Sequence, residues 1–273
     1  MSLSAPDLRS RKRRRGAAPI VMVTAYDEPG ARYVDAAGVD AILVGDSLAN
    51  VVLGHADTLH VSVEDMAHHV RAVVAASPAA HVVADLPWLS YHLGVHDAVR
   101  NAATLIRAGA QSVKLEGGRE RVEVIDALRD AEIPVMGHLG LTPQSVLAFG
   151  GFKVQARTHD AVDRLLADAA ALQEAGVYAI VIEGVPGVVG TRVTESLEIP
   201  TIGIGAGPDT DGQVLVFHDL LGLSGRSPAK FVRPYADLGT AITEAITRYR
   251  DDVREGRFPG PAETYATPAE LVE

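Results

Sequence analysis

Four acidic side chains, each placed directly after a short apolar run, are the residues of this sequence best suited to chemistry. The runs Ala-Ile-Leu-Val-Gly, Val-Val-Ala, Val-Lys-Leu and Ile-Val-Ile end in Asp46, Asp85, Glu116 and Glu183, and His138 follows Val-Met-Gly. Carboxylates without thiolates suit a hard cation such as Mg²⁺, which takes oxygen ligands. One such acid alone could equally be a helix cap or a surface salt bridge. Four acids in the same position predict a shared site.

The elements that must position these acids are short strands alternating with helices. Apolar, β-branched runs predict eight strands, at residues 20–26, 41–46, 81–86, 112–116, 134–139, 179–183, 201–205 and 213–217. Gly38, Gly109 and Gly176 are placed to end the preceding helices in left-handed caps. Near-continuous apolar strands indicate a parallel sheet buried on both faces. Eight such units in about 250 residues predict an α/β fold, a (β/α)8 TIM barrel in a single domain, rather than an open doubly wound sheet.

In a barrel of this kind the active site lies at the carboxyl ends of the strands. Because side chains two residues apart in a strand share a face, Lys114 and Glu116 point the same way, as do Met136 and His138. We therefore expect several ionisable groups to converge in one mouth of the barrel.

Composition and charge exclude several classes of protein. The chain has 273 residues, of which 47% are hydrophobic, and no cysteine, so disorder, a disulfide framework and a cysteine nucleophile are excluded. Residues 9–15 carry six positive charges, although the net charge is −10. Such a run can bind nucleic acid or a membrane surface, but no second basic cluster extends it. No stretch approaches the roughly 18 apolar residues of a membrane span. We expect a solvated basic segment, no nucleic-acid or membrane partner, and a cytoplasmic location.

The chain is expected to have three parts. They are a basic N-terminal segment at 1–19, a catalytic barrel at 20–256 and an irregular C-terminal tail at 257–273. A last amphipathic helix before the tail is indicated by Ile242, Ile246, Tyr249 and Val253.

Longer motifs surround the acids and extend over most of the chain. They are Thr-Ala-Tyr-Asp at 24–27, Leu-Val-Gly-Asp-Ser at 43–47, Val-Ala-Asp-Leu-Pro at 83–87, Val-Lys-Leu-Glu-Gly-Gly at 113–118, Pro-Val-Met-Gly-His-Leu-Gly-Leu-Thr-Pro-Gln-Ser at 134–145, Gly-Gly-Phe-Lys-Val-Gln at 150–155 and Ile-Pro-Thr-Ile-Gly-Ile-Gly-Ala-Gly-Pro at 199–208. In these motifs and their order, from about residue 20 to residue 238, the chain resembles the ketopantoate hydroxymethyltransferase (3-methyl-2-oxobutanoate hydroxymethyltransferase) family.

The resemblance implies a (β/α)8 barrel that assembles as a homo-oligomer, usually a decamer. It implies a one-carbon transferase of pantothenate and coenzyme A biosynthesis. The reaction would move a hydroxymethyl unit from 5,10-methylenetetrahydrofolate to 3-methyl-2-oxobutanoate (2-oxoisovalerate), giving 2-dehydropantoate (ketopantoate) through magnesium-assisted enolisation and C–C bond formation.

The family's site carries over to matching positions of this chain. The resemblance places Mg²⁺ on Asp46, Asp85 and Glu116 and makes Glu183 the catalytic base. Substrate contacts, by the same resemblance, fall on two of the metal ligands and on three further residues: Asp46, Ser47, Asp85, Lys114 and His138. Two departures from the family pattern stand near the site: the stretch 54–62 lacks a common tyrosine and proline, and Gly184 replaces a residue with a side chain.

Two other interpretations compete with this one. A different magnesium barrel acting on 2-oxo acids, such as the phosphoenolpyruvate mutase and isocitrate lyase relatives, would share the acidic mouth, but lyases of the isocitrate type use a cysteine that this chain lacks. A non-catalytic barrel that binds ligands or nucleic acid through its basic segment is the second alternative, and the presence of Glu183 and Asp85 argues against it.

Overall fold

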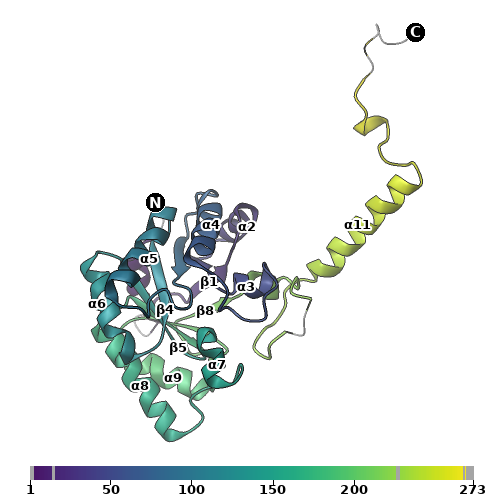
Figure 1. Ribbon diagram of the computed structural model, residues 1–273. Helices are drawn as coiled ribbons and strands as arrows, with labels where there is room; N and C mark the ends of the chain where they lie inside the picture. Colours follow the sequence, from purple (N-terminus) through teal and green to yellow (C-terminus); the bar gives the residue numbers. More distant parts are fainter. Residues whose placement is uncertain (1–2, 14–15, 226–227, 267, 269–273) are drawn as a thin grey trace. The chain divides into compact units, whose positions relative to one another are not determined.

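The computed structural model describes residues 3–13, 16–225, 228–266 and 268. Eight parallel strands form a closed barrel in which each strand pairs with the next and β8 pairs with β1 (Figure 1). The strands are β1 (Ile20–Thr24), β2 (Ala41–Val44), β3 (His81–Asp85), β4 (Ser112–Glu116), β5 (Val135–Gly140), β6 (Ala179–Glu183), β7 (Thr201–Ile204) and β8 (Gly212–Leu215). All eight predicted strands are present, which confirms the barrel, and their ends shift by up to two residues, as assigned strand ends commonly do.

Helices alternate with the strands, and the longer ones between β1 and β7 surround the barrel (Figure 1). They are α1 (Ala5–Arg9), α2 (Glu28–Ala36), α3 (Leu48–Val51), α4 (Val63–Val74), α5 (Val95–Ala108), α6 (Val122–Asp130), α7 (Val146–Phe149), α8 (His159–Glu174), α9 (Gly187–Ser196), α10 (Phe217–Leu220) and α11 (Leu238–Arg254), with 3₁₀ turns η2 (Arg119–Arg121), η3 (Pro143–Ser145) and η4 (Pro261–Glu263). The inner face of α8 buries Val162, Leu165, Ala169 and Leu172, which lie at helical spacing.

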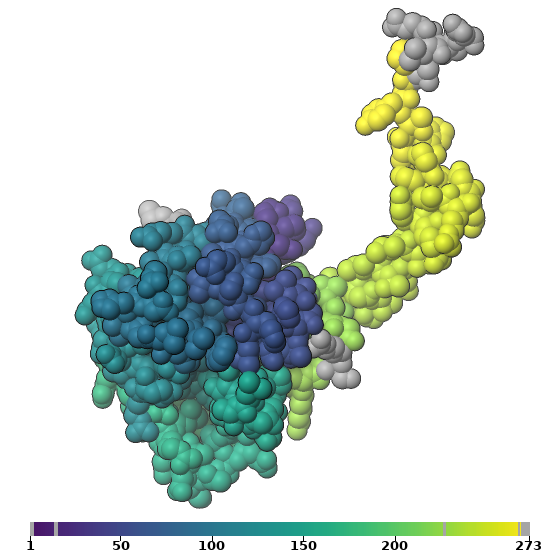
Figure 2. All heavy atoms as spheres, viewed as in Figure 1, coloured from purple at the N-terminus to yellow at the C-terminus, as the bar shows by residue number. Residues whose placement is uncertain are grey.

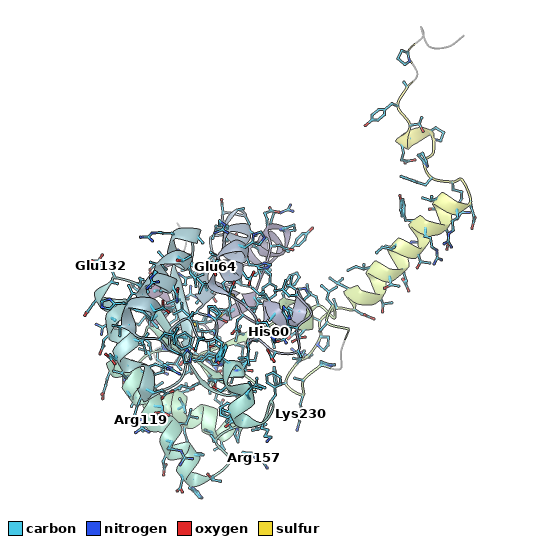
Figure 3. The ribbon with its side chains drawn as sticks, viewed as in Figure 1. His60, Glu64, Arg119, Glu132, Arg157 and Lys230 are labelled. Carbon is cyan, nitrogen blue, oxygen red and sulfur yellow. The ribbon has the colours of Figure 1, made fainter. Side chains whose placement is uncertain are left out.

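The helical layer packs closely and keeps its charges outside. In the space-filling view the blue and teal segments form a closely packed surface on the face that is shown (Figure 2). Exposed charged side chains such as Arg119 and Glu132 lie at the outer edge of this layer (Figure 3). The apolar faces of α4, α5 and α8 are buried inside this layer, where they contact the strands.

The chain divides into two compact units. One comprises the residues up to Phe217 together with Ala229–Val232, and the other comprises His218–Pro228 and the residues from Arg233 onward. The first contains the whole barrel, and the second contains α11, which is the amphipathic helix expected before the tail. The expected boundaries at residues 19 and 256 stay predictions.

The basic N-terminal segment packs against the amino ends of the strands, so the expectation that it is solvated is wrong for Lys12, while Arg9 and Arg13 are exposed. Lys12 Nζ lies 2.8 Å from Asp211 Oδ2 and donates to the carbonyl of Thr194 at 2.6 Å, and the side chains of Lys12 and Asp211 are each only 1% exposed. Arg9 donates to the carbonyl of Val177 at 3.0 Å. The positive charge of the segment alone does not indicate that a buried acid, Asp211, pairs with Lys12. Arg14 and Arg15 lie outside the described residues.

Across the described ranges, no helix combines the length and apolar character needed to span a membrane.

Candidate active site

One small cavity at the carboxyl ends of the strands collects every predicted site residue. Its volume is about 100 Å³. Its lining includes Asp46, Ser47, Asp85, Lys114, Glu116, His138 and Glu183. The structure thus brings all seven side chains together, as the strand positions predicted, while their individual roles stay predictions.

Strand register explains which side chains become neighbours. Lys114 on β4 is in register with Asp85 on β3, and Glu116 is in register with His138 on β5. Residues in register across parallel strands point to the same face. Lys114 Nζ lies 3.0 Å from Asp85 Oδ1, and both side chains are almost fully buried. Burial alone would lower the pKa of Lys114, but the charges of Asp85, Glu116 and Asp46 raise it above its usual value, so the ammonium stays charged.

The carboxylates outnumber the cation that faces them. Burial raises the pKa of Asp46 well above its usual value, and the nearby charges of Asp85 and Glu116 raise it further. Burial also raises the pKa of Glu116, against the opposing effect of Lys114. The site therefore holds more negative charge than Lys114 compensates, and a bound cation would relieve the repulsion.

Gln144 and Tyr91 tie two of these acids together, a feature that the sequence analysis missed. The Gln144 amide donates to Asp46 Oδ2 at 2.8 Å, and its backbone N–H donates to Glu116 Oε2 at 3.0 Å. The buried Tyr91 hydroxyl donates to Gln144 Oε1 at 2.6 Å and accepts the Glu116 backbone N–H at 3.2 Å. Gln144 belongs to the Thr-Pro-Gln-Ser motif, but a side chain without charge gave no chemical reason to single it out.

His138 connects the acidic cluster to Glu183. Its Nε2 lies 3.2 Å from Glu183 Oε2, and its Nδ1 lies 3.2 Å from Lys114 Nζ. Burial lowers the pKa of His138 and the Lys114 charge lowers it further, so the ring is neutral near pH 7. Nδ1 also lies 3.2 Å from Glu116 Oε1. A ring protonated on Nε2 accepts from the Lys114 ammonium and turns its proton toward Glu183, whereas a ring protonated on Nδ1 turns its proton toward Glu116. The Glu183 side chain is 15% exposed, against 4% for Glu116, so it is the more accessible acid.

The glycine after Glu183 fixes the backbone rather than loosening it. Gly184 has φ of 58°, in the left-handed region, and a Cβ there would come within 2.9 Å of the Leu141 Cβ. Its N–H donates to the Ile204 carbonyl at 2.9 Å and its carbonyl accepts from the Gln155 N–H at 2.8 Å. Although Gly184 departs from the family pattern, these two hydrogen bonds hold the carboxyl end of β6 in place.

Two hydroxyl groups stand beside the acids. Tyr26 and Ser47 share a hydrogen bond of 2.9 Å, and burial raises the pKa of Tyr26, which stays a neutral phenol. A Cβ at Gly45 would lie 2.8 Å from Ser47 Oγ and 3.5 Å from Asp85 Oδ2, so a glycine lets these groups approach. Ser47 lines the cavity, so its hydroxyl can donate to a small oxygen-rich ligand there while it accepts the Tyr26 O–H. Tyr26, which lies in the Thr-Ala-Tyr-Asp motif, was not predicted as a site residue.

The donor set can be tested for its fit to Mg²⁺. No three His, Asp or Glu side chains in the described ranges form a ready-made metal cluster, because Lys114 and Gln144 stand between the carboxylates. The three carboxylates nevertheless offer only oxygen ligands, and they repel one another, with the Lys114 ammonium as their counter-ion. Oxygen-only ligands with surplus negative charge are what Mg²⁺ requires. The residues therefore fit a hard divalent cation.

A closed barrel of eight parallel strands, with charged side chains gathered at their carboxyl ends, defines an enzyme of the (β/α)8 class. The profile of the family described as ketopantoate hydroxymethyltransferase matches residues 2–261. The chain belongs to this family and is a hydroxymethyltransferase, which confirms the resemblance found in its motifs.

Individual relatives agree with the family assignment. A protein of Moorella thermoacetica named 3-methyl-2-oxobutanoate hydroxymethyltransferase is 56% identical over 93% of this chain and 94% of its own length. A protein of the same name from Koribacter versatilis is 54% identical over 92% of this chain and 86% of its own length.

Solved structures support the fold alone. The structure of 2,3-dimethylmalate lyase, a PEP mutase/isocitrate lyase superfamily member, has a TM-score of 0.63 at 22% identity and covers 99% of this chain and 94% of its own. Phosphonopyruvate hydrolase in complex with oxalate and Mg²⁺ has a TM-score of 0.63 at 15% identity, over 96% of this chain and 93% of its own.

Proposed function

We propose that this enzyme forms ketopantoate by transferring a hydroxymethyl unit from 5,10-methylenetetrahydrofolate to 3-methyl-2-oxobutanoate. The observation that carries the proposal is one cavity in which three carboxylates and Lys114 lie next to the His138–Glu183 pair. The names of the relatives support formation of the same product. The family resemblance further leads us to propose a cytoplasmic homo-oligomer, a decamer, acting in pantothenate biosynthesis without nucleic-acid or membrane partners.

The first chemical problem is a weakly acidic proton. The C3 proton of the keto acid lies next to a ketone, and its removal gives an enolate whose charge must be stabilised as it forms. Asp46, Asp85 and Glu116 would hold Mg²⁺, which, when bound, acts as a Lewis acid toward the substrate oxygens. Lys114 offsets the substrate carboxylate, and Ser47 donates a hydrogen bond to it.

Glu183 removes the proton in this proposal. It is the most accessible acid of the cavity, and His138 Nε2, 3.2 Å from its Oε2, helps to hold the carboxylate in position. The C3–H bond breaks with the proton passing to Glu183, and the enolate carbon forms the new C–C bond to the one-carbon unit. Both C–N bonds of the donor's methylene group break, one water supplies the hydroxyl of the product, and the C3 proton and the second proton of that water end on the two nitrogens of tetrahydrofolate.

The direct test is product formation. The full-length protein, Mg²⁺, 3-methyl-2-oxobutanoate and 5,10-methylenetetrahydrofolate are incubated together, and ketopantoate is followed by NMR. Product should accumulate with all components and vanish when the donor is omitted. Glu64→Gln, a variant at an exposed position of α4 far from any assigned role, should form ketopantoate at the wild-type rate. Absence of ketopantoate in the complete mixture would refute the proposal.

A further inference from the structure

We propose that a second cavity beside the active site binds the one-carbon donor, a ligand with a flat heteroaromatic ring and an anionic tail. This inference rests on the proposed function. The cavity has a volume of about 620 Å³, against about 100 Å³ for the active-site cavity. Drug-sized ligands occupy pockets of about 300–1,000 Å³. A small keto acid suits the inner cavity, but a donor of folate size needs the larger one.

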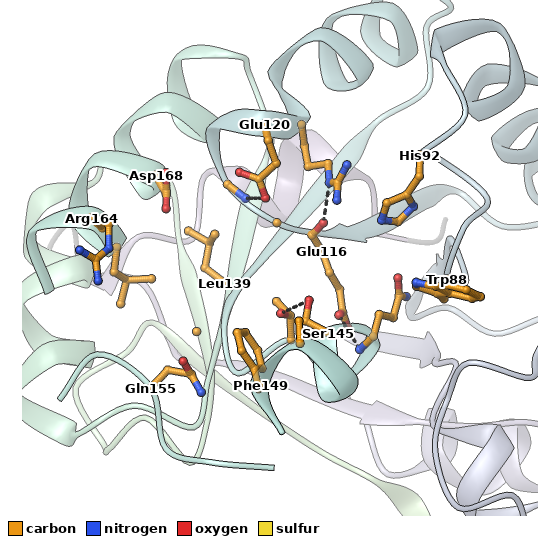
Figure 4. Close-up of a pocket in the computed structure, with 18 of the residues that line it drawn as sticks. Trp88, His92, Glu116, Glu120, Leu139, Ser145, Phe149, Gln155, Arg164 and Asp168 are labelled. Carbon is orange, nitrogen blue, oxygen red and sulfur yellow. Dashed lines mark hydrogen bonds between the residues drawn. The ribbon is translucent and has the colours of Figure 1, made fainter. Parts of the chain in front are cut away.

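Glu116 connects the two cavities. It lines both of them, and Gln144 and Tyr91, which hold it, also line the larger one. In Figure 4, Trp88 and His92 lie at one end of the larger cavity, Arg164 and Asp168 lie at the opposite end, and Glu116 lies between them. A ligand that spans this cavity would therefore bring its middle part, not its ends, next to the active site. That is where a donor with a ring at one end and a charged tail at the other carries its reactive carbon.

The end with Trp88 suits a heteroaromatic ring. The rings of Tyr91 and His92 lie 4.3 Å apart, and the Arg121 guanidinium lies 5.3 Å from the Tyr91 ring centroid. The Tyr91 ring is buried, so Trp88, which is 40% exposed, offers the face on which a flat ligand can stack. His92 Nδ1 is buried and has no hydrogen-bond partner among the described residues, and an unpaired buried nitrogen costs free energy that a polar ring edge would recover. Burial lowers the pKa of His92 to about 4, so it meets a ligand as a neutral ring.

The opposite end suits an anion. Arg164, on α8, is exposed and forms no ion pair with any described residue. Its neighbour Asp168 does not neutralise it, because Asp168 is paired with Arg119 at 2.7 Å. Glu120, the other acid of the rim, accepts the Gly118 N–H at 3.0 Å. A guanidinium without a partner binds carboxylates with paired hydrogen bonds. The carboxylate tail of a folate would provide them.

The sole tryptophan makes the cavity observable without turnover. The chain has one tryptophan, and it is Trp88. Tetrahydrofolate is titrated into the full chain without keto acid or Mg²⁺, and fluorescence is corrected against N-acetyltryptophanamide. Saturable quenching is expected. Arg164→Ala should raise the dissociation constant about tenfold, the loss of one charge-assisted contact of about 1.4 kcal/mol. Arg107→Ala, at an exposed arginine of α5 outside the cavity, is the control and should leave it unchanged.

A second probe separates the ring from the tail. 6-Methyltetrahydropterin, which lacks the tail, should quench Trp88 with the same affinity in the wild type and in Arg164→Ala. Unquenched fluorescence, or equal tetrahydrofolate affinity in both proteins, would overturn the inference. If ketopantoate forms and the donor KM of Arg164→Ala is unchanged, this cavity is not the donor site although the proposed function stands. Saturable quenching weakened by Arg164→Ala, in a protein that forms no ketopantoate, supports the ligand site and overturns only the proposed function.

Discussion

Replacing Lys12 with methionine should destabilise the barrel by about 3 kcal/mol. Methionine keeps the apolar stem but removes the ammonium that lies 2.8 Å from Asp211, where both side chains are 1% exposed. Breaking a buried ion pair on one side costs about 3–5 kcal/mol, because the remaining charge is left buried without compensation. Asp211 keeps hydrogen bonds from the backbone N–H groups of Thr201 and Arg13, each at 2.8 Å, so we expect the lower end of that range. For a chain of this size the melting temperature should fall by roughly 6–12 °C.

Urea unfolding measured by circular dichroism gives the free energy directly. Arg11→Met is the matched control, since the Arg11–Asp40 pair is partly exposed and such pairs contribute about 1 kcal/mol or less. Adding Asp211→Asn to Lys12→Met should restore part of the loss, because the double variant no longer buries a lone charge. If Lys12→Met unfolds at the same urea concentration as the wild type, the N-terminal segment is a solvated appendage and the reasoning is refuted.

Three further predictions concern the site and its surroundings. Asp46→Asn and Asp85→Asn should each weaken Mg²⁺ binding, because each removes an anionic oxygen ligand. Calorimetric Mg²⁺ titration checks this, and wild-type affinity in either variant would count against the ligand set. Gln144→Leu should lower Mg²⁺ affinity and reduce the free energy of unfolding by about 2–4 kcal/mol, as measured by urea unfolding. The substitution removes the side-chain hydrogen bonds to Asp46 and to the Leu86 carbonyl, and it leaves the Tyr91 hydroxyl without its acceptor. His92 should titrate near pH 4 by NMR. Between pH 6.5 and about 4 the folded state binds fewer protons at His92 than the unfolded state does, so the free energy of unfolding falls as the pH falls through that window. His92→Gln should reduce this dependence of stability on pH.

The barrel could be predicted because its signals are local. Each strand is a short apolar run, and each polar residue that closes a run reaches the mouth through strand geometry alone. Asp46, Asp85, Glu116 and Glu183 were found for this reason, before any contact between strands was known. Their convergence follows from barrel closure, which requires no detail of side-chain packing.

Contacts between distant segments could not be predicted in the same way. Gln144 and Tyr91 act through hydrogen bonds to each other across 53 residues of sequence, and neither residue type is distinctive alone. Lys12 reaches Asp211 across 199 residues, and its position in a basic run favoured the opposite expectation. The larger cavity is assembled from several loops and α8, so its volume depends on loop packing that no periodicity encodes.

The role of Glu183 is tested most directly by exchange of the C3 proton of 3-methyl-2-oxobutanoate with deuterium. With Mg²⁺ present and no donor, the wild-type enzyme should exchange this proton, as followed by NMR. Glu183→Gln should bind the keto acid with unchanged affinity by calorimetry, while exchange slows by roughly 10²- to 10⁴-fold, the usual contribution of a positioned general base. Exchange at the wild-type rate with binding intact would contradict the account and move the base role to another group, with His138, 3.2 Å away, as the next candidate.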